Sequence, residues 1–565
     1  MKPVYYTLIL LLLITSCKNT PQKTPEQTIG LTSKNAMVVS ARKEASLIGT
    51  AILKQGGNVF DAMMATELAL AVAYPYAGNL GGGGFMVYRL NNGDIGALDY
   101  REKAPMAATK TMYLDQDGNV IPDKSTLGSM AIGVPGTVAG VFAAHKKFGT
   151  LPIATILEPV IALAKRGVVV TEKQAKHIQA KRPLFQKVNK DTILFDADWK
   201  ANDTIKYPVL ARTLEHLVKH GKDGFYQGEI AKTLATFIQD NGGIITEEDL
   251  ANYEAKWRTP VVFNYDDLKV ISMAPPSSGG ICLGEIMTMI APYDLSTYGH
   301  NSTKAIQIIT EAERRAYADR SYYLGDPDFV EIPSERLLSE AYLKDRMSDV
   351  SFDKATLSSS LKHGNVELVE SDETTHYSIV DQYGNAIAVT TTLNGAYGSK
   401  LYCSELGFFL NNEMDDFSSK PGEPNMFGLI GAEANSIAPQ KRMLSSMTPT
   451  IVEKNGALYM TVGTPGGSTI ITSVLQTILN VHEFNMGMQE AVNAPRFHHQ
   501  WLPDEILMEP NKFNHETILE LEQKGYLINE KDAPIIGRVD GILKREDGTL
   551  EAGADYRGDD TAIGF

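Results

Sequence analysis

The hydrophobic pattern predicts two helices and two strands near the start of the chain. Apolar side chains recur at helical spacing over residues 41–73, and Gly56 and Gly57 divide this stretch in two. Apolar and aromatic residues in 85–90 and 95–100 indicate strands that are joined by a polar turn. Arg101 therefore stands at a strand end, where side chains commonly reach into a site.

The pattern changes character along the rest of the chain. Residues 107–369 read mostly as amphipathic helix with short strand interruptions, whereas 374–565 show alternating strand patterns separated by glycine turns. Neither an internal repeat nor an interdomain linker is visible. We therefore expect one compact unit.

A β-hairpin is predicted at the junction between these two parts. Residues 374–380 and 386–394 are strand-like, and the loop between them contains Gly384, which suits a left-handed conformation. If the loop has three residues, counting back from it sets Thr374 opposite Thr392. Two hydroxyl groups then face each other across the hairpin.

The hydroxyl of Thr374 lacks an evident external base, because the sequence shows no convincing Ser-His-Asp or Cys-His arrangement. Cleavage of the bond before Thr374 would place an α-amino group, with a pKa near ~8, on the same residue. Its β-branched side chain has few rotamers, which would keep the hydroxyl and the amine in a fixed relative position. A plain strand pair is the ordinary interpretation of Thr-Thr.

Composition narrows the class of protein. The chain has 43% hydrophobic residues, which is typical of a globular protein, and its net charge of -15 argues against nucleic-acid binding. Cys282 and Cys403 lie in apolar surroundings, so we expect two buried thiols rather than a bridge, although a single bridge is possible.

The first 35 residues predict export. Lys2 precedes an apolar run over 4–14 that is too short for a permanent membrane span, which is typical of a signal peptide. The residues Ile-Thr-Ser-Cys at 14–17 resemble a bacterial lipobox, in which Cys17 is acylated; an ordinary secretion signal is the alternative. Residues 18–35 are rich in Lys, Thr, Gln and Pro and predict a flexible tether.

Several motifs that suggest ligands receive structural interpretations. The glycines at 81–84 lack the spacing and the following helix of a phosphate loop, so they predict tight backbone packing. The segment 115–118 is interpreted as a turn, because its glycine comes too early for an EF-hand. His498 and His499 should point to opposite faces of a strand and share no metal ion. The charged helix over 311–320 is explained by solvated ion pairs.

Segments spread along the chain carry a specific family resemblance. They are Thr-Thr-His-Tyr-Ser at 374–378, Leu-Asn-Asn-Glu-Met-Asp-Asp-Phe at 410–417, Leu-Ser-Ser-Met at 444–447 and Pro-Gly-Gly-Ser at 465–468, with further matches at 78–86, 99–102, 133–136, 275–280 and 493–500. From about residue 36 to 565 the chain resembles the γ-glutamyltransferase (γ-glutamyltranspeptidase) family of N-terminal-nucleophile hydrolases. The resemblance implies an α+β fold, an αββα sandwich, and two chains cut from one precursor, 36–373 and 374–565.

The resemblance also implies roles for individual residues, without cofactor or metal. Thr374 is the nucleophile and Thr392 supports it, while Gly466 and Gly467 match an oxyanion hole. Further residues match those that hold the two charged groups of the donor: Arg101, Ser445 and Ser446 for the α-carboxylate, and Asn394, Glu413 and Asp416 for the α-ammonium. Glycine suits an oxyanion hole because it lets backbone N–H groups approach closely.

The implied activity is autocatalytic cleavage before Thr374, followed by transfer of the γ-glutamyl group of glutathione and similar amides to water or amino acids. The signal peptide and the lipobox-like residues predict export and a membrane anchor at Cys17 that faces the periplasm or the cell surface. A related acylase of the glutaryl-cephalosporin type and a non-catalytic binding lipoprotein are the alternatives. Residues 421–431 resemble a lid, and Phe427 stands where relatives often carry Tyr, which leaves acceptor preference open.

Overall fold

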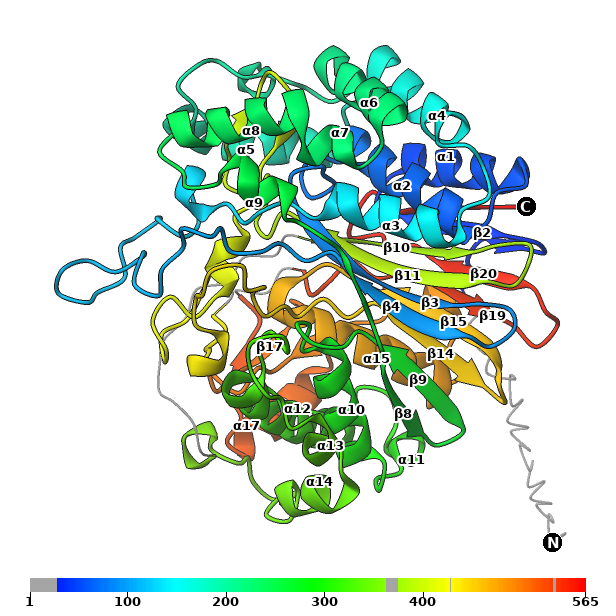
Figure 1. The fold of residues 1–565 in the computed structure, drawn as a ribbon. Coiled ribbons are helices and arrows are strands. Elements are labelled where there is room, and N and C mark those ends of the chain that lie inside the picture. Colours follow the sequence, from blue (N-terminus) through cyan, green and yellow to red (C-terminus); the bar gives the residue numbers. More distant parts are fainter. Residues whose placement is uncertain (1–27, 362–373, 427, 532–534) are drawn as a thin grey trace, which may run out of the picture.

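Two seven-stranded sheets lie face to face between two layers of helices (Figure 1). The computed structural model describes residues 28–361, 374–426, 428–531 and 535–565. The predicted signal peptide, Cys17 and Phe427 lie outside these residues. The layering confirms the expected αββα architecture.

The first sheet has the β10–β11 hairpin at its centre. Its order is β21 (Thr561–Gly564), β2 (Met37–Ser40), β10 (Thr374–Val380), β11 (Ala386–Thr392), β3 (Gly83–Arg89), β4 (Ile95–Asp99) and β7 (Lys256–Arg258), all antiparallel. Thr374 pairs with Thr392, and Gly384 has φ +86° in the loop. The predicted register is confirmed, because a short glycine turn determines it locally.

The second sheet packs against the first. Its order is β1 (Thr32–Ser33), β20 (Leu550–Gly553), β19 (Asp540–Lys544), β15 (Ala457–Gly463), β14 (Thr450–Lys454), β9 (Leu268–Ser272) and β8 (Val261–Tyr265). The tether prediction for 18–35 is wrong at its end, because Thr32 and Ser33 pair with β20 and Gly30 N donates to Glu551 Oε1 at 3.2 Å. Backbone pairing with an edge strand orders a segment that has few apolar residues.

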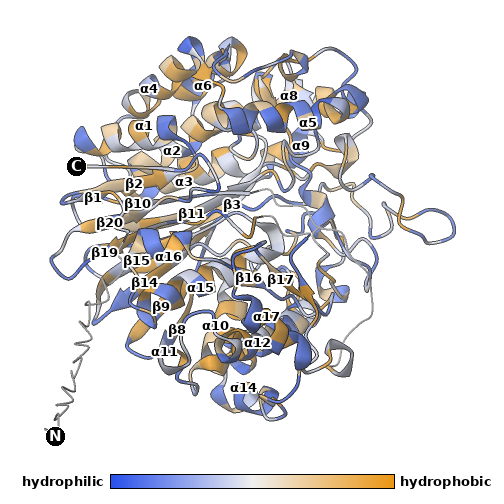
Figure 2. Ribbon diagram, turned by 180° about the vertical axis from the view of Figure 1, so that it is seen from behind, coloured by the Kyte–Doolittle hydropathy of each residue, from blue (hydrophilic) through white to orange (hydrophobic). Residues whose placement is uncertain are grey.

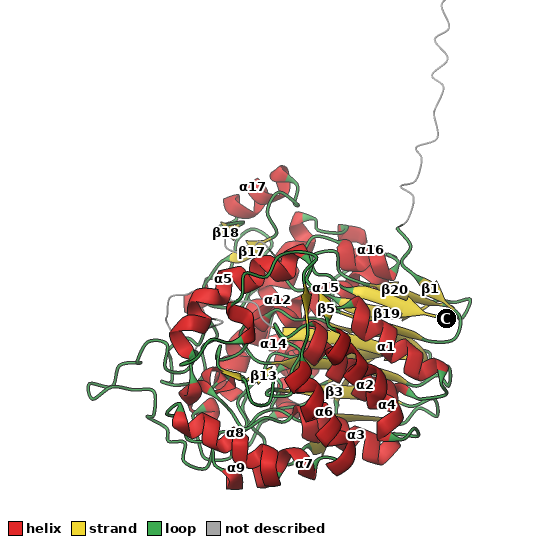
Figure 3. Cartoon of the chain, turned by 90° about the horizontal axis from the view of Figure 1, so that it is seen from above, coloured by secondary structure: helices red, strands yellow, loops and turns green. Residues whose placement is uncertain are grey.

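Helices cover the outer face of each sheet (Figures 1 and 3). The first layer comprises α1 (Lys43–Lys54), α2 (Val59–Ala73), α3 (Thr137–Phe148), α4 (Ile153–Arg166), α5 (Glu172–Val188), α6 (Pro208–His220), α7 (Asp223–Tyr226), α8 (Gly228–Asp240) and α9 (Glu247–Ala251). The second comprises α10 (Gly279–Ile290), α11 (Leu295–Tyr298), α12 (Thr303–Tyr323), α13 (Ser334–Leu337), α14 (Glu340–Arg346), α15 (Ile470–His482), α16 (Met488–Asn493) and α17 (His515–Gln523). The two helices predicted over 41–73 are α1 and α2.

Short elements complete the chain. They are β5 (Val168–Val169) with β6 (Thr204–Ile205), β12 (Tyr402–Cys403) with β13 (Phe408–Phe409), and β16 (Phe497–His498), β17 (Ile506–Met508) and β18 (Ile528–Asn529), together with single 3₁₀ turns η1 (Ser129–Ala131), η2 (Leu194–Asp196), η3 (Ser358–Ser360), η4 (Glu413–Asp416), η5 (Glu433–Asn435) and η6 (Gly467–Thr469). Two of these turns, η4 and η6, are the ones that carry predicted site residues.

Alternation along the strands of the first sheet divides their side chains between two of the hydrophobic cores. On β2, Val38 packs with the first helical layer, whereas Met37 and Val39 pack between the sheets. On β3, Met86 packs with the first helical layer and Phe85 packs between the sheets. Both faces of each central strand are therefore buried, and apolar residues gather along the interior elements in Figure 2.

The charged helix α12 is buried, so the expectation of solvated ion pairs is wrong. The side chains of Glu311, Arg315 and Glu313 are inaccessible, and Arg315 Nη1 donates to Glu311 Oε2 at 2.7 Å inside the protein. The helix packs against both α10 and α17. Sequence periodicity alone could not reveal this, because partners from distant segments stabilise the buried charges: Tyr526 Oη donates to Glu311 Oε1, and Asp349 pairs with Arg315.

The structural interpretations of the remaining motifs are confirmed. A Cβ on Gly82 would lie 2.0 Å from Thr392 O, so the glycines at 81–84 allow tight packing. Asp115 Oδ1 accepts hydrogen bonds from Asn119 N and Asp117 N, which makes 115–119 a turn.

Buried cysteines and histidines also behave as expected. Cys282 and Cys403 are buried free thiols, and burial raises the pKa of Cys403 to about 12. His498 contacts Thr472 and Gln500, whereas His499 contacts Asp504, and burial lowers the pKa values of the two rings to about 3 and about 4. Both cysteines and both histidines therefore have structural roles.

Glu67 on α2 makes folding stability depend on pH. Its Oε2 accepts a hydrogen bond of 2.7 Å from Tyr377 on β10, and burial raises its pKa from 4.5 to about 7. The folded state therefore binds more protons than the unfolded state in this interval, so the stabilisation is complete below pH 4.5 and is lost as the pH rises through 7. In the wild type, the free energy of unfolding should therefore fall as the pH rises from about 5 to 8. In Glu67→Gln this fall should be smaller by about 3 kcal/mol.

Urea unfolding of both proteins at these two pH values measures this difference. Glu229→Gln is the matched control, because Glu229 is exposed on α8. Equal pH dependence in the wild type and in Glu67→Gln would contradict the assignment.

Candidate active site

Thr374 begins β10, and its side chain is buried beside the end of β11. Thr374 Oγ1 lies 3.4 Å from Thr392 Oγ1, and the Thr374 residue is 4% exposed. Thr392 Oγ1 also accepts a hydrogen bond of 2.8 Å from Asn394 N. The two hydroxyl groups are therefore close enough for a hydrogen bond in which either oxygen can be the donor.

A single cleft of about 270 Å³ brings most of the predicted residues together. Nine of the ten line it: Arg101, Thr374, Thr392, Asn394, Glu413, Asp416, Ser445, Ser446 and Gly467. The tenth, Gly466, lines a separate small cavity with Gly537 and Arg538. Leu429, Met447 and Ile470 supply an apolar part of the cleft wall that sequence reasoning missed.

Arg101 is buried among three carboxyl groups. Its Nη1 donates to Glu413 and its Nη2 to Asp416, both from turn η4, and Glu102 Oε2 lies 3.8 Å from Nη1. Burial opposes the charge of Arg101, but the three carboxylates raise its pKa above the ordinary value. The guanidinium therefore remains charged inside the protein.

Burial raises the pKa values of all three carboxyl groups around Arg101. Burial raises the pKa of Glu102 to about 7 and raises that of Glu413 well above its usual range, and Arg101 opposes both shifts. Burial also raises the pKa of Asp416. Sequence reasoning gave Glu102 no role; the available signal was its place directly after Arg101.

Ser445 and Ser446 present their hydroxyl groups to the cleft. Ser445 Oγ accepts from Met447 N at 3.1 Å, and Ser446 Oγ accepts from Arg320 Nη2 at 3.0 Å. Each oxygen already accepts a bond from the protein, so each hydrogen can be donated to a ligand. Together with Arg101, the two hydroxyls form a donor set suited to a carboxylate.

Gly466 and Gly467 connect β15 to the start of α15. Gly466 has φ +136° and Gly467 has φ +51°, both in the region that glycine favours. A Cβ on Gly466 would lie 2.4 Å from Thr469 Oγ1. The turn η6 continues directly into α15, so its backbone N–H groups lie at a helix N-terminus, where negative charge is stabilised.

The predicted lid contacts the cleft through its described residues. Asn425 Nδ2 donates to Asp416 Oδ1 at 3.0 Å, Met426 N donates to Asp415 Oδ2 at 2.9 Å, and Leu429 lines the cleft. These bonds link the loop to turn η4, which carries two of the site carboxylates. Movement of this loop would therefore alter the charged end of the cleft.

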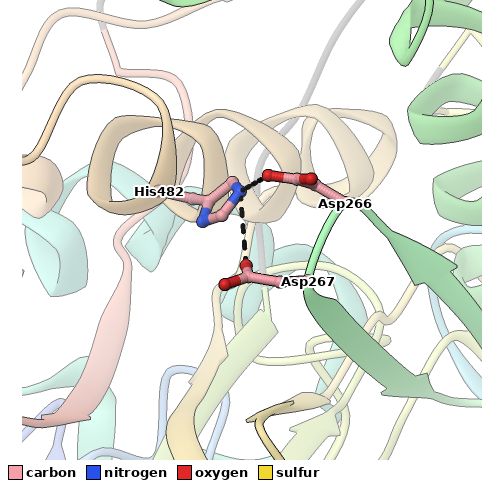
Figure 4. Close-up of side chains that lie close together, drawn as sticks. All are labelled: Asp266, Asp267 and His482. Atoms are coloured by element: carbon pink, nitrogen blue, oxygen red, sulfur yellow. Dashed lines mark hydrogen bonds and ion pairs between the residues drawn. The ribbon is translucent and has the colours of Figure 1, made fainter.

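A cluster with metal-ligating atoms lies away from the cleft (Figure 4). His482 Nε2 at the end of α15 is 3.2 Å from Asp266 Oδ2 and 3.9 Å from Asp267 Oδ1 in the β8–β9 turn. Lys454 Nζ also lies 3.1 Å from Asp267 Oδ2. Both carboxylates are exposed and ion pairs account for their positions, so we assign no metal to them.

Comparison with known proteins places this cleft in context. A gamma-glutamyltranspeptidase family model matches residues 45–565. The chain is 45% identical over 538 residues to the glutathione hydrolase proenzyme of Escherichia coli strain K12, covering 94% of this chain and 92% of that protein. The gamma-glutamyltranspeptidase structure from Helicobacter pylori aligns at 43% identity and TM-score 0.56, over 62% of this chain and 99% of that one.

A second solved structure shares the architecture. The cephalosporin acylase from Bacillus halodurans aligns with a TM-score of 0.84 over 97% of this chain and 99% of that one, at 24% identity. At this identity the likeness concerns the fold alone. No helix in the described part of the chain has the length and apolarity needed to cross a membrane.

Proposed function

Because the chain belongs to the γ-glutamyltranspeptidase family, we propose that it is a glutathione hydrolase and γ-glutamyltransferase that matures by cleaving itself before Thr374. The observation that carries the proposal is the cleft, which places the Thr374 hydroxyl in the same cavity as a buried guanidinium, two carboxylates and two serine hydroxyls. Such a cavity suits a ligand with both a carboxylate and an ammonium group at one end.

Maturation begins with the intact chain. The Thr374 hydroxyl attacks the carbonyl carbon of residue 373, the C–N bond breaks, and the nitrogen takes up a proton as an ester forms. Water then opens the ester, which restores the hydroxyl and leaves a carboxyl group on residue 373. The products are a large chain ending at 373 and a small chain beginning at Thr374.

Turnover uses the new α-amino group as the base. It takes the proton from the Thr374 hydroxyl as the oxygen attacks the γ-carbonyl, and it delivers that proton to the departing amine. Thr392 orients the attacking oxygen, and N–H groups at Gly466 and Gly467 stabilise the oxyanion. Water or an acceptor amine then releases the γ-glutamyl group from its ester.

The donor is selected at its α end. Arg101, Ser445 and Ser446 bind the α-carboxylate, while Asp416, Glu413 and Asn394 hold the α-ammonium. Three carboxyl groups share the single positive charge of Arg101, so this end of the cleft favours a donor that brings an ammonium group, which a glutaryl amide lacks. This favours the transferase over an acylase on the same fold.

The choice between γ-glutamyl and glutaryl donors is measurable. Wild type should release p-nitroaniline from γ-glutamyl-p-nitroanilide at a kcat/KM at least about 10-fold above that for glutaryl-p-nitroanilide, since a hydrogen-bonded charge contributes about 1.5–3 kcal/mol. Asp416→Asn should lower the first value and leave the second little changed. Faster release from the glutaryl amide would instead support the acylase.

Export and lipid attachment form part of the proposal. The apolar run over 4–14 and the lipobox-like residues at 14–17 support removal of a signal peptide and acylation of Cys17. Radioactive palmitate should label the wild type, and Cys17→Ala should lose the label. Unlabelled wild-type protein with an intact-mass spectrum of an unmodified chain would contradict the anchor.

A further inference from the structure

Arg320 is a buried cation beside the cleft that has no role in the mechanism so far. It lies near the end of α12 and is 3% exposed. Its Nε donates to Ser278 Oγ at 2.9 Å and its Nη2 to Ser446 Oγ at 3.0 Å. No carboxylate in the described part of the chain lies within ion-pair distance, although buried charges are usually paired.

We propose that Arg320 is a positioning residue that prepares Ser446 to bind the α-carboxylate of the donor. A serine hydroxyl carries one hydrogen, and the bond from Arg320 occupies its oxygen as acceptor. The hydrogen of Ser446 is then directed away from Arg320 and toward the cleft. The inference rests on the proposed function, because it concerns the donor of that same reaction.

The second donor of Arg320 extends its effect to Ser445. Ser278 Oγ accepts from Arg320 and donates to Ser445 O at 2.7 Å, while Ser278 N donates to the same oxygen at 2.8 Å. Ser445 N in turn donates to Pro276 O at 2.9 Å. Arg320 therefore holds the two adjacent serines, one directly and one through Ser278.

The charge of Arg320 adds to this orientation. Arg320 and Asp416 line one small cavity that adjoins the cleft through Asp416 and Leu429. A guanidinium without a carboxylate ion pair leaves positive potential at the end of the cleft that also holds Arg101. An incoming α-carboxylate is therefore attracted to the serine pair as well as to Arg101.

The test compares two donors that differ only in the α-carboxylate. In mature enzyme, Arg320→Met should raise KM for γ-glutamyl-p-nitroanilide by about 10- to 100-fold, as expected for loss of hydrogen bonding around a charged group, with a smaller effect on kcat. With 4-aminobutyryl-p-nitroanilide, which lacks the carboxylate, kcat/KM should not change. Arg320→Lys should recover part of the loss, because it restores charge and one donor.

Two further variants separate positioning from general stability. The double variant Ser446→Ala, Arg320→Met should raise KM for γ-glutamyl-p-nitroanilide little more than either single change, because both substitutions remove the same hydrogen bond. Arg315→Met is the matched control: Arg315 is buried on the same helix but pairs with Glu311 and Asp349. It should lower the melting temperature without altering the ratio of the two donors.

The failures of the two hypotheses are distinguishable. Self-cleavage on a denaturing gel reports whether each variant folds, and the Lys variant provides the measurement if Arg320→Met does not mature. Wild type that releases nothing from γ-glutamyl-p-nitroanilide would remove the proposed function and this inference with it. Active wild type with unchanged KM in the Arg320 variants, or with equal losses on both donors, would overturn the inference alone.

Discussion

Thr374→Ala is expected to remain a single uncleaved chain and to release no p-nitroaniline from γ-glutamyl-p-nitroanilide. The change removes the hydroxyl that we propose as the nucleophile in both maturation and turnover, and loss of a nucleophile typically lowers kcat by about 10,000-fold or more. A denaturing gel and a p-nitroaniline assay on the same preparation measure the two effects. Splitting by Thr374→Ala would refute the autocatalytic step.

Neighbouring substitutions show whether the effect is specific. Thr375→Ala should mature and retain activity, because the buried Thr375 hydroxyl has no hydrogen-bond partner among the described residues. Thr374→Ser should also cleave itself, since serine supplies the same hydroxyl and amine, but more slowly because it loses the restricted rotamers of a β-branched side chain. Edman sequencing of the small chain should then begin with Ser-Thr-His.

Arg101→Lys should lower kcat/KM for γ-glutamyl-p-nitroanilide by about 100-fold or more, because two hydrogen bonds to charged groups are replaced by a less directed contact. The two Nη atoms of Arg101 also donate to Glu413 and Asp416 inside the protein. The single ammonium nitrogen of lysine cannot reproduce this pair of planar hydrogen bonds. Steady-state kinetics should show most of the loss in KM, since the proposed role of Arg101 is to bind the end of the donor remote from the reacting carbonyl.

Arg258→Lys is the control for this substitution. Arg258 is an ion-paired arginine on β7, bound to Asp99 and Asp328 rather than to the cleft. It should retain wild-type KM. If Arg101→Lys also retained wild-type KM, the α-carboxylate would have to bind elsewhere.

Local chemistry accounts for what the sequence could predict. The β10–β11 register was predictable because a glycine loop determines pairing over a few residues, and this alone placed Thr374 opposite Thr392. The helices over 41–73 followed from apolar spacing. The motifs around Arg101, Asp416 and Ser446 supported a family resemblance, and the family is confirmed.

Only the tertiary structure decided which of these motifs meet and what surrounds them. Burial of α12, the contacts of Arg101 with Glu413 and Asp416, and the bond from Arg320 to Ser446 all depend on segments far apart in sequence. Sequence periodicity shows which face of a helix or strand is apolar, but it does not show which distant charged residue pairs with a buried one. The sequence by itself therefore determined the hairpin that carries the proposed nucleophile, whereas the electrostatics of the cleft depend on how the sheets and helices pack.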